Sequence, residues 1–132
     1  MSGLLYDYSQ WPNFSHGELV CQHTGLENPN IDSFTSLMNW VQGLRDSVGV
    51  PFKVTSCYRH ETHPYEVKKL KPGMHNIAAI DIQVPIEHAH ELVRLAFQRG
   101  FTGIGWKMHG AQKNRFIHLD RRVGPQRIWT YP

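Results

Sequence analysis

Cysteine is scarce in this sequence, and its two copies are not arranged for a metal knuckle or a disulfide framework. Cys21 and Cys57 lie far apart in the sequence and lack the CxxC spacing of zinc knuckles and redox motifs. Two cysteines are also too few for a disulfide framework. We therefore expect two free thiols, and any metal ligands must come from other residue types.

The chain also has no long apolar run and no recognisable leader. Its hydrophobic stretches are far shorter than the roughly 20 residues that cross a membrane. The N-terminal segment MSGLLYDYSQWPNF has no basic portion followed by an apolar one, as a secretory signal would have. We therefore expect a soluble protein with no membrane partner, cytoplasmic until it is released by some other route.

The sequence also has no large excess of positive or negative charge. The formal net charge is only +3 at pH 7, and the basic residues are scattered apart from the group Lys68, Lys69 and Lys71. Proteins that bind nucleic acid usually gather basic side chains on one face. We expect no nucleic-acid partner, although a mild affinity for an anionic polymer would fit the same charge.

What the sequence does contain is a globular composition and many histidines. Its 132 residues are 40% hydrophobic, include four Trp and hold no repeat or low-complexity tract, so we expect one monomeric domain over residues 1–132. Nine histidines are unusual, and histidine is both the commonest metal-binding side chain and a general acid or base. Since an enriched count proves neither role, their positions must decide.

The hydrophobic pattern predicts an α+β fold. Apolar residues recur at three- and four-residue steps over residues 31–48 and again over about 87–99, which indicates two amphipathic helices. Short β-rich runs predict strands at 52–56, 79–84, 103–106 and 116–119. Residues 58–74 are polar and contain Pro and Gly, so we expect a long loop there, and such loops are often functional. This order of elements predicts a mostly antiparallel sheet covered by helices.

Two of the predicted strands each carry one potential metal ligand on their polar face. Alternation places Ile80 and Ile82 on one face of their strand and Asp81 on the other. In the last predicted strand, His118 stands in the same way between two apolar neighbours. His75 comes just before the first of these strands, where the end of the long loop could fold over the polar face.

These three residues form a plausible ligand set for zinc. Two imidazoles and a carboxylate suit Zn²⁺, and three protein ligands leave a fourth position for water, which is typical of catalytic rather than structural sites. Spacing alone fits another interpretation equally well, in which His75 lies on the surface, Asp81 is solvated and His118 is half-buried.

At this point the sequence resembles a known family. Five segments occur in the order found in the zinc D-Ala-D-Ala carboxypeptidase and L-alanyl-D-glutamate endopeptidase family, especially its small phage-type members: FSHGELVC, LRDSVGVPFKVTSCYR, HPYEVKKLKPGMHNIAAIDI, GFTGIGW and FIHLDRR with a terminal RIW. The resemblance covers residues 14–129. It implies a hedgehog/DD-peptidase fold and a zinc peptidase acting on peptidoglycan stem peptides, as a D,D-carboxypeptidase or an L,D-endopeptidase.

The resemblance also implies roles for individual residues. His75 and Asp81 match the family's SxHxxGxAxD metal-binding element, and His118 in FIHLD matches its third ligand. Arg59 matches the arginine of the SGYR element, whose guanidinium binds carboxylate or carbonyl groups of the substrate. A phage lysin or a virion-associated enzyme would agree with the absence of a signal peptide.

Three departures from the family pattern stand out. His75 and Asp81 are six residues apart, one fewer than in the family's element. SCYR replaces SGYR, which places Cys57 near Arg59. Some relatives carry a His two residues before the last ligand or an acid three before it, but these positions hold Phe116 and Arg115 here.

No general base can therefore be carried over from the family, and other candidates have to be considered. Asp120 could orient the His118 ring or handle protons itself, and His109 is a second candidate. His63 belongs to the long loop, where it could contact substrate. The alternative is a catalytically inactive module that keeps zinc and binds the cell wall or serves in a virion. A thiol hydrolase using Cys57 is a third hypothesis.

Overall fold

The computed structural model describes residues 3–71 and 73–132 and contains one five-stranded mixed sheet. The strands are β1 (Lys53–Ser56), β2 (Ala79–Gln83), β3 (Gly103–Lys107), β4 (Phe116–Asp120) and β5 (Arg127–Thr130). They lie in the order β1-β2-β4-β3-β5. Only β3 and β5 run parallel, and the other neighbours are antiparallel. The α+β class and the mostly antiparallel sheet are therefore as the sequence predicts.

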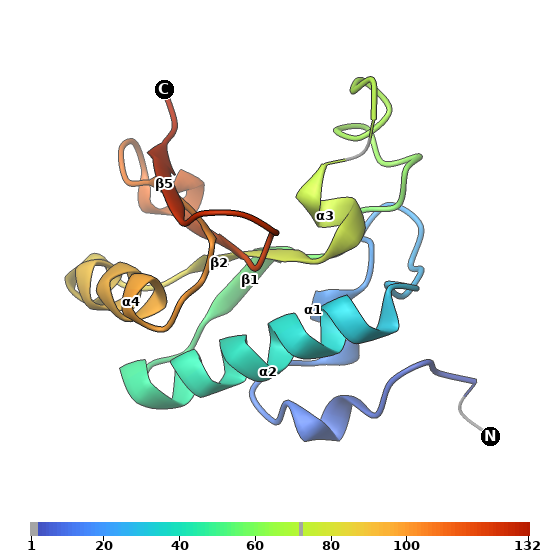
Figure 1. Ribbon diagram of the computed structural model, residues 1–132, viewed down its shortest axis with the longest axis horizontal. Helices are drawn as coiled ribbons and strands as arrows, with labels where there is room; N and C mark the ends of the chain where they lie inside the picture. The colour runs from blue at the N-terminus through green and yellow to red at the C-terminus, as the bar shows by residue number, and fades with distance from the viewer. Residues whose placement is uncertain (1–2, 72) are drawn as a thin grey trace.

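Two long helices cover the apolar face of this sheet. α2 (Ile31–Val48) and α4 (Ile86–Gln98) lie on the same side of it, whereas α3 (Met74–Ile77) lies on the other side (Figure 1). The buried core joins the inner faces of both helices to the apolar side chains of β2, β3 and β4: Ile80, Ile82, Ile104, Ile117 and Leu119. Burying these side chains leaves the opposite face of the same strands free for polar residues.

The N-terminal segment is fastened beneath α2 by aromatic packing. It contains η1 (Tyr8–Gln10) and is followed by α1 (His16–Leu19). Trp11 is fully buried and packs edge-on against Phe34 of α2, with ring centroids 5.7 Å apart. The Trp11 indole also donates a hydrogen bond to the Asn39 side chain at 2.9 Å. This segment therefore completes the core from the side opposite the sheet.

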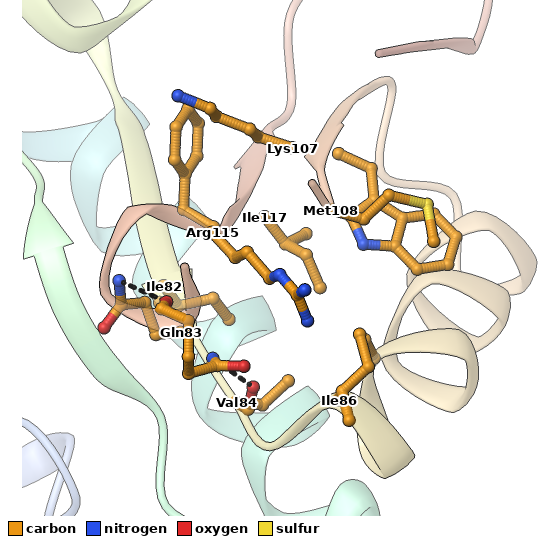
Figure 2. A pocket seen from close by; sticks show the side chains of 12 residues that line it. Ile82, Gln83, Val84, Ile86, Lys107, Met108, Arg115 and Ile117 are labelled. Atoms are coloured by element: carbon orange, nitrogen blue, oxygen red, sulfur yellow. Dashed lines mark hydrogen bonds between the residues drawn. The ribbon is translucent and has the colours of Figure 1, made fainter. Parts of the chain in front are cut away.

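A small apolar pocket of about 20 Å³ lies between the start of α4 and the strands β2, β3 and β4 (Figure 2). Ile82, Ile86 and Ile117 are among its lining side chains. The Arg115 side chain lies along it, and its Nε donates to the carbonyl of Gly110 at 2.9 Å. Next to it, η2 (Gln112–Asn114) connects β3 to β4.

Most predicted elements are confirmed, with shifts of one or two residues at their ends. The helix over 31–48 has the predicted bounds, and the four predicted strands are all present. Two short helices, one strand and two 3₁₀ turns were not predicted: α1, α3, β5, η1 and η2. The two helices are single turns, too short for a period to be recognised, and β5 is an edge strand with mostly exposed residues. Within the described residues, no helix is both long and apolar enough to cross a membrane.

Candidate metal site

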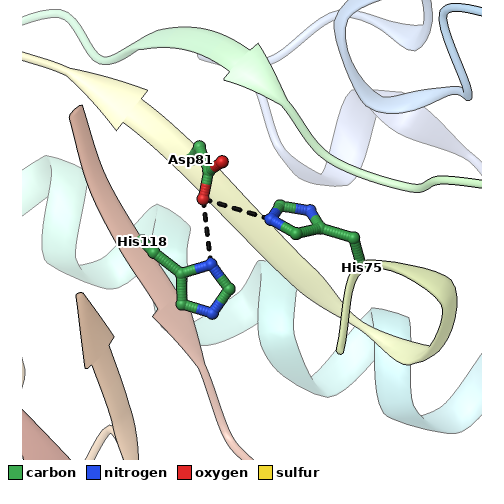
Figure 3. Close-up of side chains that lie close together, drawn as sticks. All are labelled: His75, Asp81 and His118. Carbon is green, nitrogen blue, oxygen red and sulfur yellow. Dashed lines mark hydrogen bonds and ion pairs between the residues drawn. The ribbon is translucent and has the colours of Figure 1, made fainter. Parts of the chain in front are cut away.

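Asp81 and His118 face each other across two neighbouring strands. β2 and β4 pair antiparallel in a register that places these two residues directly opposite one another. Nδ1 of His118 lies 2.9 Å from Oδ1 of Asp81 (Figure 3). Their apolar neighbours point into the core, so the two-residue period of both strands forces the carboxylate and the imidazole onto the same polar face.

His75 reaches the same carboxylate from α3. Its Nε2 lies 3.2 Å from Oδ1 of Asp81, and its side chain is buried (Figure 3). The single turn of helix before β2 accounts for this approach despite the shortened spacing, because it lifts His75 off the strand and over the polar face. The backbone carbonyl of His75 accepts a hydrogen bond from the N–H of Arg59 at 2.9 Å, which fixes α3 to the loop after β1.

Both imidazoles are held from behind by acceptors. Nδ1 of His75 lies 2.6 Å from the backbone carbonyl of Cys57, and because a carbonyl only accepts, this nitrogen carries the proton. Nε2 of His118 lies 2.7 Å from Oδ2 of Asp120. The remaining nitrogens, Nε2 of His75 and Nδ1 of His118, point toward Asp81. This is the arrangement in which second partners orient metal-binding histidines.

The three side chains fit a single metal ion. One ligand atom from each of His75, Asp81 and His118 lies within 4.8 Å of the other two, and all three residues are buried. Ligands about 2.1 Å from a tetrahedral zinc would lie about 3.4 Å from one another. The two imidazole-to-carboxylate separations, 3.2 and 2.9 Å, are close to this value. The nitrogen and oxygen donors also match the preferences of zinc.

The electrostatics of the site favour an ionised Asp81. Burial by itself would raise the pKa of this carboxyl, but the charge of His75 and the hydrogen bonds from both imidazoles hold it well below its usual range. Burial lowers the pKa of His118, but the hydrogen bonds to Asp120 and Asp81 outweigh it, and the net direction is upward. In the metal-free protein, a proton on His118 therefore supplies positive charge at the point where a metal cation could bind.

Asp120 is fixed below the site by an arginine. It is completely buried, and its carboxylate accepts hydrogen bonds from Nε and Nη2 of Arg122 at 2.9 and 2.6 Å. Burial raises the pKa of Asp120, but the hydrogen bonds from His118 and Arg122 hold it well below its usual range. Gly103 lies opposite Asp120 on β3, and any Cβ at this position would collide with the carboxylate. The geometry favours the orienting role for Asp120 over proton transfer by its own carboxylate.

The three candidate ligands open into a cavity of about 350 Å³. Its other lining residues are basic, aromatic or apolar: Arg59, Lys69, Met74, Phe116, Arg122 and Tyr131. A neighbouring cavity of about 300 Å³ shares Arg59, Asp81 and Phe116 with the first and is also lined by His63. The structure thus brings Arg59 to the ligand group and places His63 one cavity away.

Arg59 is positioned by several partners at once. Its Nε donates to the Ser56 hydroxyl at 2.9 Å, and its Nη2 lies 3.6 Å from Oδ2 of Asp81. Its Nη1 lies 3.9 Å from the buried carboxylate of Glu66, which also accepts a hydrogen bond from the N–H of Gly73 at 2.8 Å. Glu66 thereby ties Arg59 to the end of the loop that precedes α3.

His109 and Arg115 lie outside the ligand cavity. His109 is exposed on the connection between β3 and β4, and its Nε2 lies 2.9 Å from the carbonyl of Pro132 and 3.2 Å from that of Tyr131. It therefore holds the C-terminal segment. Arg115 lines the apolar pocket of Figure 2 and not the ligand cavity, whereas its neighbour Phe116 lines both.

Cys57 contributes its backbone, not its thiol, to the site. The side chain belongs to the buried core and is 1% exposed. Burial raises the pKa of the thiol well above its usual range, so it stays protonated and unreactive. Both cysteines are free and buried, as expected.

Sequence reasoning missed Glu66 and Tyr131. Glu66 stands within the polar run YEVKK, where nothing distinguishes a buried carboxylate from a solvated one. Tyr131 follows β5, which the sequence pattern does not reveal as a strand. With that strand known, alternation places Trp129 and Tyr131 on the polar face with Asp81 and His118.

The fold and the site together define a class of protein. An α+β sheet presents a buried His-Asp-His group on its polar face, and the group opens into a basic cavity, as a three-ligand catalytic metal site would. The model of the Peptidase M15 family matches residues 12–120, which is most of the chain. The chain belongs to this peptidase family, which confirms the resemblance drawn from the five segments. No curated protein and no solved structure matches the chain.

Proposed function

We propose that this protein is a zinc-dependent peptidase that hydrolyses amide bonds in peptidoglycan stem peptides. The observation that carries the proposal is the convergence of His75, Asp81 and His118 on one point of a cavity that also contains Arg59. Membership of the Peptidase M15 family supports the same conclusion.

In this proposal His75, Asp81 and His118 hold the zinc, each with its donor atom already turned inward. A bound zinc ion polarises a carbonyl and makes water a nucleophile near neutral pH. Asp120 and the Cys57 carbonyl keep the imidazoles in the orientation that binding needs. Because the two imidazole rings already have this orientation, they need not reorganise when zinc binds.

Arg59 and the charge of the cavity account for the proposed substrate. Arg59, Lys69 and Arg122 line the cavity, and Asp81 is the one acidic residue among its described lining residues. An anionic peptide is attracted to such a site, and a planar guanidinium suits a carboxylate or carbonyl group of that peptide. Stem peptides carry carboxylates next to D-centres, which ordinary proteases do not accept.

A second candidate is a zinc-containing module that binds the cell wall without cleaving it. One observation favours it: among the described residues that line the ligand cavity, no histidine or carboxylate remains besides the ligands themselves to act as a general base. The two functions share the metal and the fold. Only a measurement of peptide hydrolysis distinguishes one function from the other.

The test is digestion of purified sacculi, with mass spectrometry of the released peptides. Zinc-loaded protein should release peptides, chelation should stop the release, and added zinc should restore it. The masses of the products identify the bond that is cut, and so separate carboxypeptidase from endopeptidase action. Zinc-loaded, folded protein that releases nothing from several wall chemotypes would support the binding module instead.

A further inference from the structure

Tyr131 lies in the ligand cavity although it follows the last strand. It lines this cavity together with His75, Asp81 and His118. Trp129, two residues earlier, packs against the His118 ring with centroids 5.4 Å apart. Both aromatic side chains therefore stand on the polar face of the sheet.

A glycine on the neighbouring strand makes room for them. Gly105 lies opposite His118 on one side and Trp129 on the other. A Cβ built on Gly105 would lie 2.7 Å from the Tyr131 hydroxyl and equally close to Nε1 of Trp129. Both polar atoms thus lie over a residue that has no side chain, next to the metal ligands.

Two contacts hold Tyr131 in this place, one to its ring and one to its backbone. The Phe116 ring packs against that of Tyr131 with centroids 5.0 Å apart, and His109 holds the backbone carbonyl of Tyr131 at 3.2 Å. Phe116 stands where some relatives of this family carry a histidine, so here that position supports an aromatic ring and offers no base.

The hydroxyl is left with a proton to donate. The neighbouring Trp129 indole N–H can only donate, so it cannot accept the proton of the Tyr131 hydroxyl. Burial raises the pKa of Tyr131, which keeps the group protonated at neutral pH. Two of the three basic side chains of the cavity are held by buried carboxylates, Lys69 by Glu66 and Arg122 by Asp120. The third, Arg59, is the group proposed above to bind the substrate carboxylate.

We propose that the Tyr131 hydroxyl donates a hydrogen bond to the oxygen of the scissile carbonyl as that oxygen becomes the oxyanion of the tetrahedral intermediate. The phenol keeps its proton throughout, so the group stabilises developing charge and is not an acid or a base. This inference rests on the proposed peptidase function and adds to it a catalytic residue that the family's motifs do not contain.

The test is Tyr131→Phe, which removes one oxygen and keeps the ring on Phe116. Loss of a single oxyanion donor costs about 10² to 10³ in kcat in hydrolases. We expect a fall in kcat of about 10²-fold on a stem peptide with KM within about twofold, because the donor acts in the transition state more than in the ground state. A phosphinate analogue of the peptide, which mimics the tetrahedral state, should bind correspondingly more weakly, while the affinity for the cleaved product should stay unchanged.

Tyr8→Phe is the matched control, since the Tyr8 hydroxyl bonds Glu27 at 2.8 Å and lies outside the cavity. It should keep full turnover. A structural role for the Tyr131 hydroxyl would instead lower zinc content or the melting temperature. Normal turnover and normal phosphinate affinity in Tyr131→Phe would overturn this inference alone, whereas no turnover by the wild-type protein would overturn the proposed function and this inference with it.

Discussion

The His118–Asp120 pair shows how one residue governs another at this site. Asp120 cannot reach the ligand cavity itself, since its carboxylate is buried and bonded to both His118 and Arg122. Its contact with Nε2 leaves Nδ1 of His118 as the nitrogen that faces Asp81. Asp120 therefore acts through the orientation and basicity of the imidazole.

Asp120→Asn should weaken zinc binding without unfolding the protein. Loss of an outer partner of a metal-binding histidine costs about 10- to 100-fold in metal affinity. Competition with a chromophoric chelator measures this change, and Asp32→Asn on the exposed start of α2 is the control. Unaltered zinc affinity in Asp120→Asn would show that the His118 ring is oriented by something else.

Arg59→Lys should keep the fold and the metal but lose activity. A lysine ammonium is a point charge and cannot reproduce the bidentate contact of a guanidinium with a substrate carboxylate, or the bond from Nε of Arg59 to Ser56. Charge-assisted hydrogen bonds contribute about 1.5 to 3 kcal/mol, so we expect turnover to fall roughly 10- to 100-fold. Steady-state rates on a stem peptide measure it, with the exposed Arg94→Lys on α4 as the control. Equal rates in the two variants would remove Arg59 from substrate binding.

At the scale of elements, β3 shapes the site because two of its residues are glycines, which have no side chain. Its sequence GIGWK places Ile104 in the core and two glycines on the polar face. Gly103 leaves space for the Asp120 carboxylate, and Gly105 leaves space for Trp129 and Tyr131. The glycines thus give the polar face room for the functional side chains of its neighbours.

Gly105→Ala should therefore disturb the site more than the fold. Its Cβ would lie 2.7 Å from the Tyr131 hydroxyl, and overpacking of this kind costs about 1 to 3 kcal/mol. We expect a lower denaturation midpoint and a larger loss of turnover, because Trp129 and Tyr131 must move. Gly17→Ala is the control, since a Cβ added at Gly17 would meet nothing within 4 Å. Turnover like that of the control would mean that the two aromatic side chains are not needed where they lie.

The sequence predicted some elements of the site better than others, for physical reasons. A strand has a fixed two-residue period, so Asp81 and His118 could be assigned to one face before their pairing was known. α3 is one turn long and β5 is an exposed edge strand, and neither leaves a recognisable period. The approach of His75 and the presence of Tyr131 depend on these elements, and only the three-dimensional structure reveals them.

At the scale of the whole molecule, the buried charges make the stability of the metal-free protein depend on pH. The pKa values of Asp81 and Asp120 are lower in the folded protein than in the unfolded chain. These carboxylates therefore stabilise the fold at pH values above their unfolded pKa, and this stabilisation is lost as the pH falls through their folded pKa values. His118 has a raised pKa, so its contribution is present below its unfolded pKa and is lost as pH rises through the folded value.

We therefore expect the metal-free protein to be most stable between about pH 4 and pH 6.5, with a decline on either side. Urea denaturation at a series of pH values measures this. Zinc should abolish the decline on the alkaline side, because a metal ligand must be deprotonated and zinc binding strengthens as pH rises. A metal-free protein whose stability increases steadily from about pH 6 to pH 8 would contradict the proposed pairing of His118 with both carboxylates.

The central claim is that one zinc ion, held by His75, Asp81 and His118, is required for peptide release. The most direct measurement is a titration of metal-free protein with zinc, in which bound metal and the rate of peptide release from sacculi are followed together. We expect both to rise in parallel and to stop at about one zinc per chain, and His118→Ala to gain neither, because two remaining ligands hold zinc poorly. Full release before any zinc is added, or full zinc occupancy in His118→Ala, would contradict it.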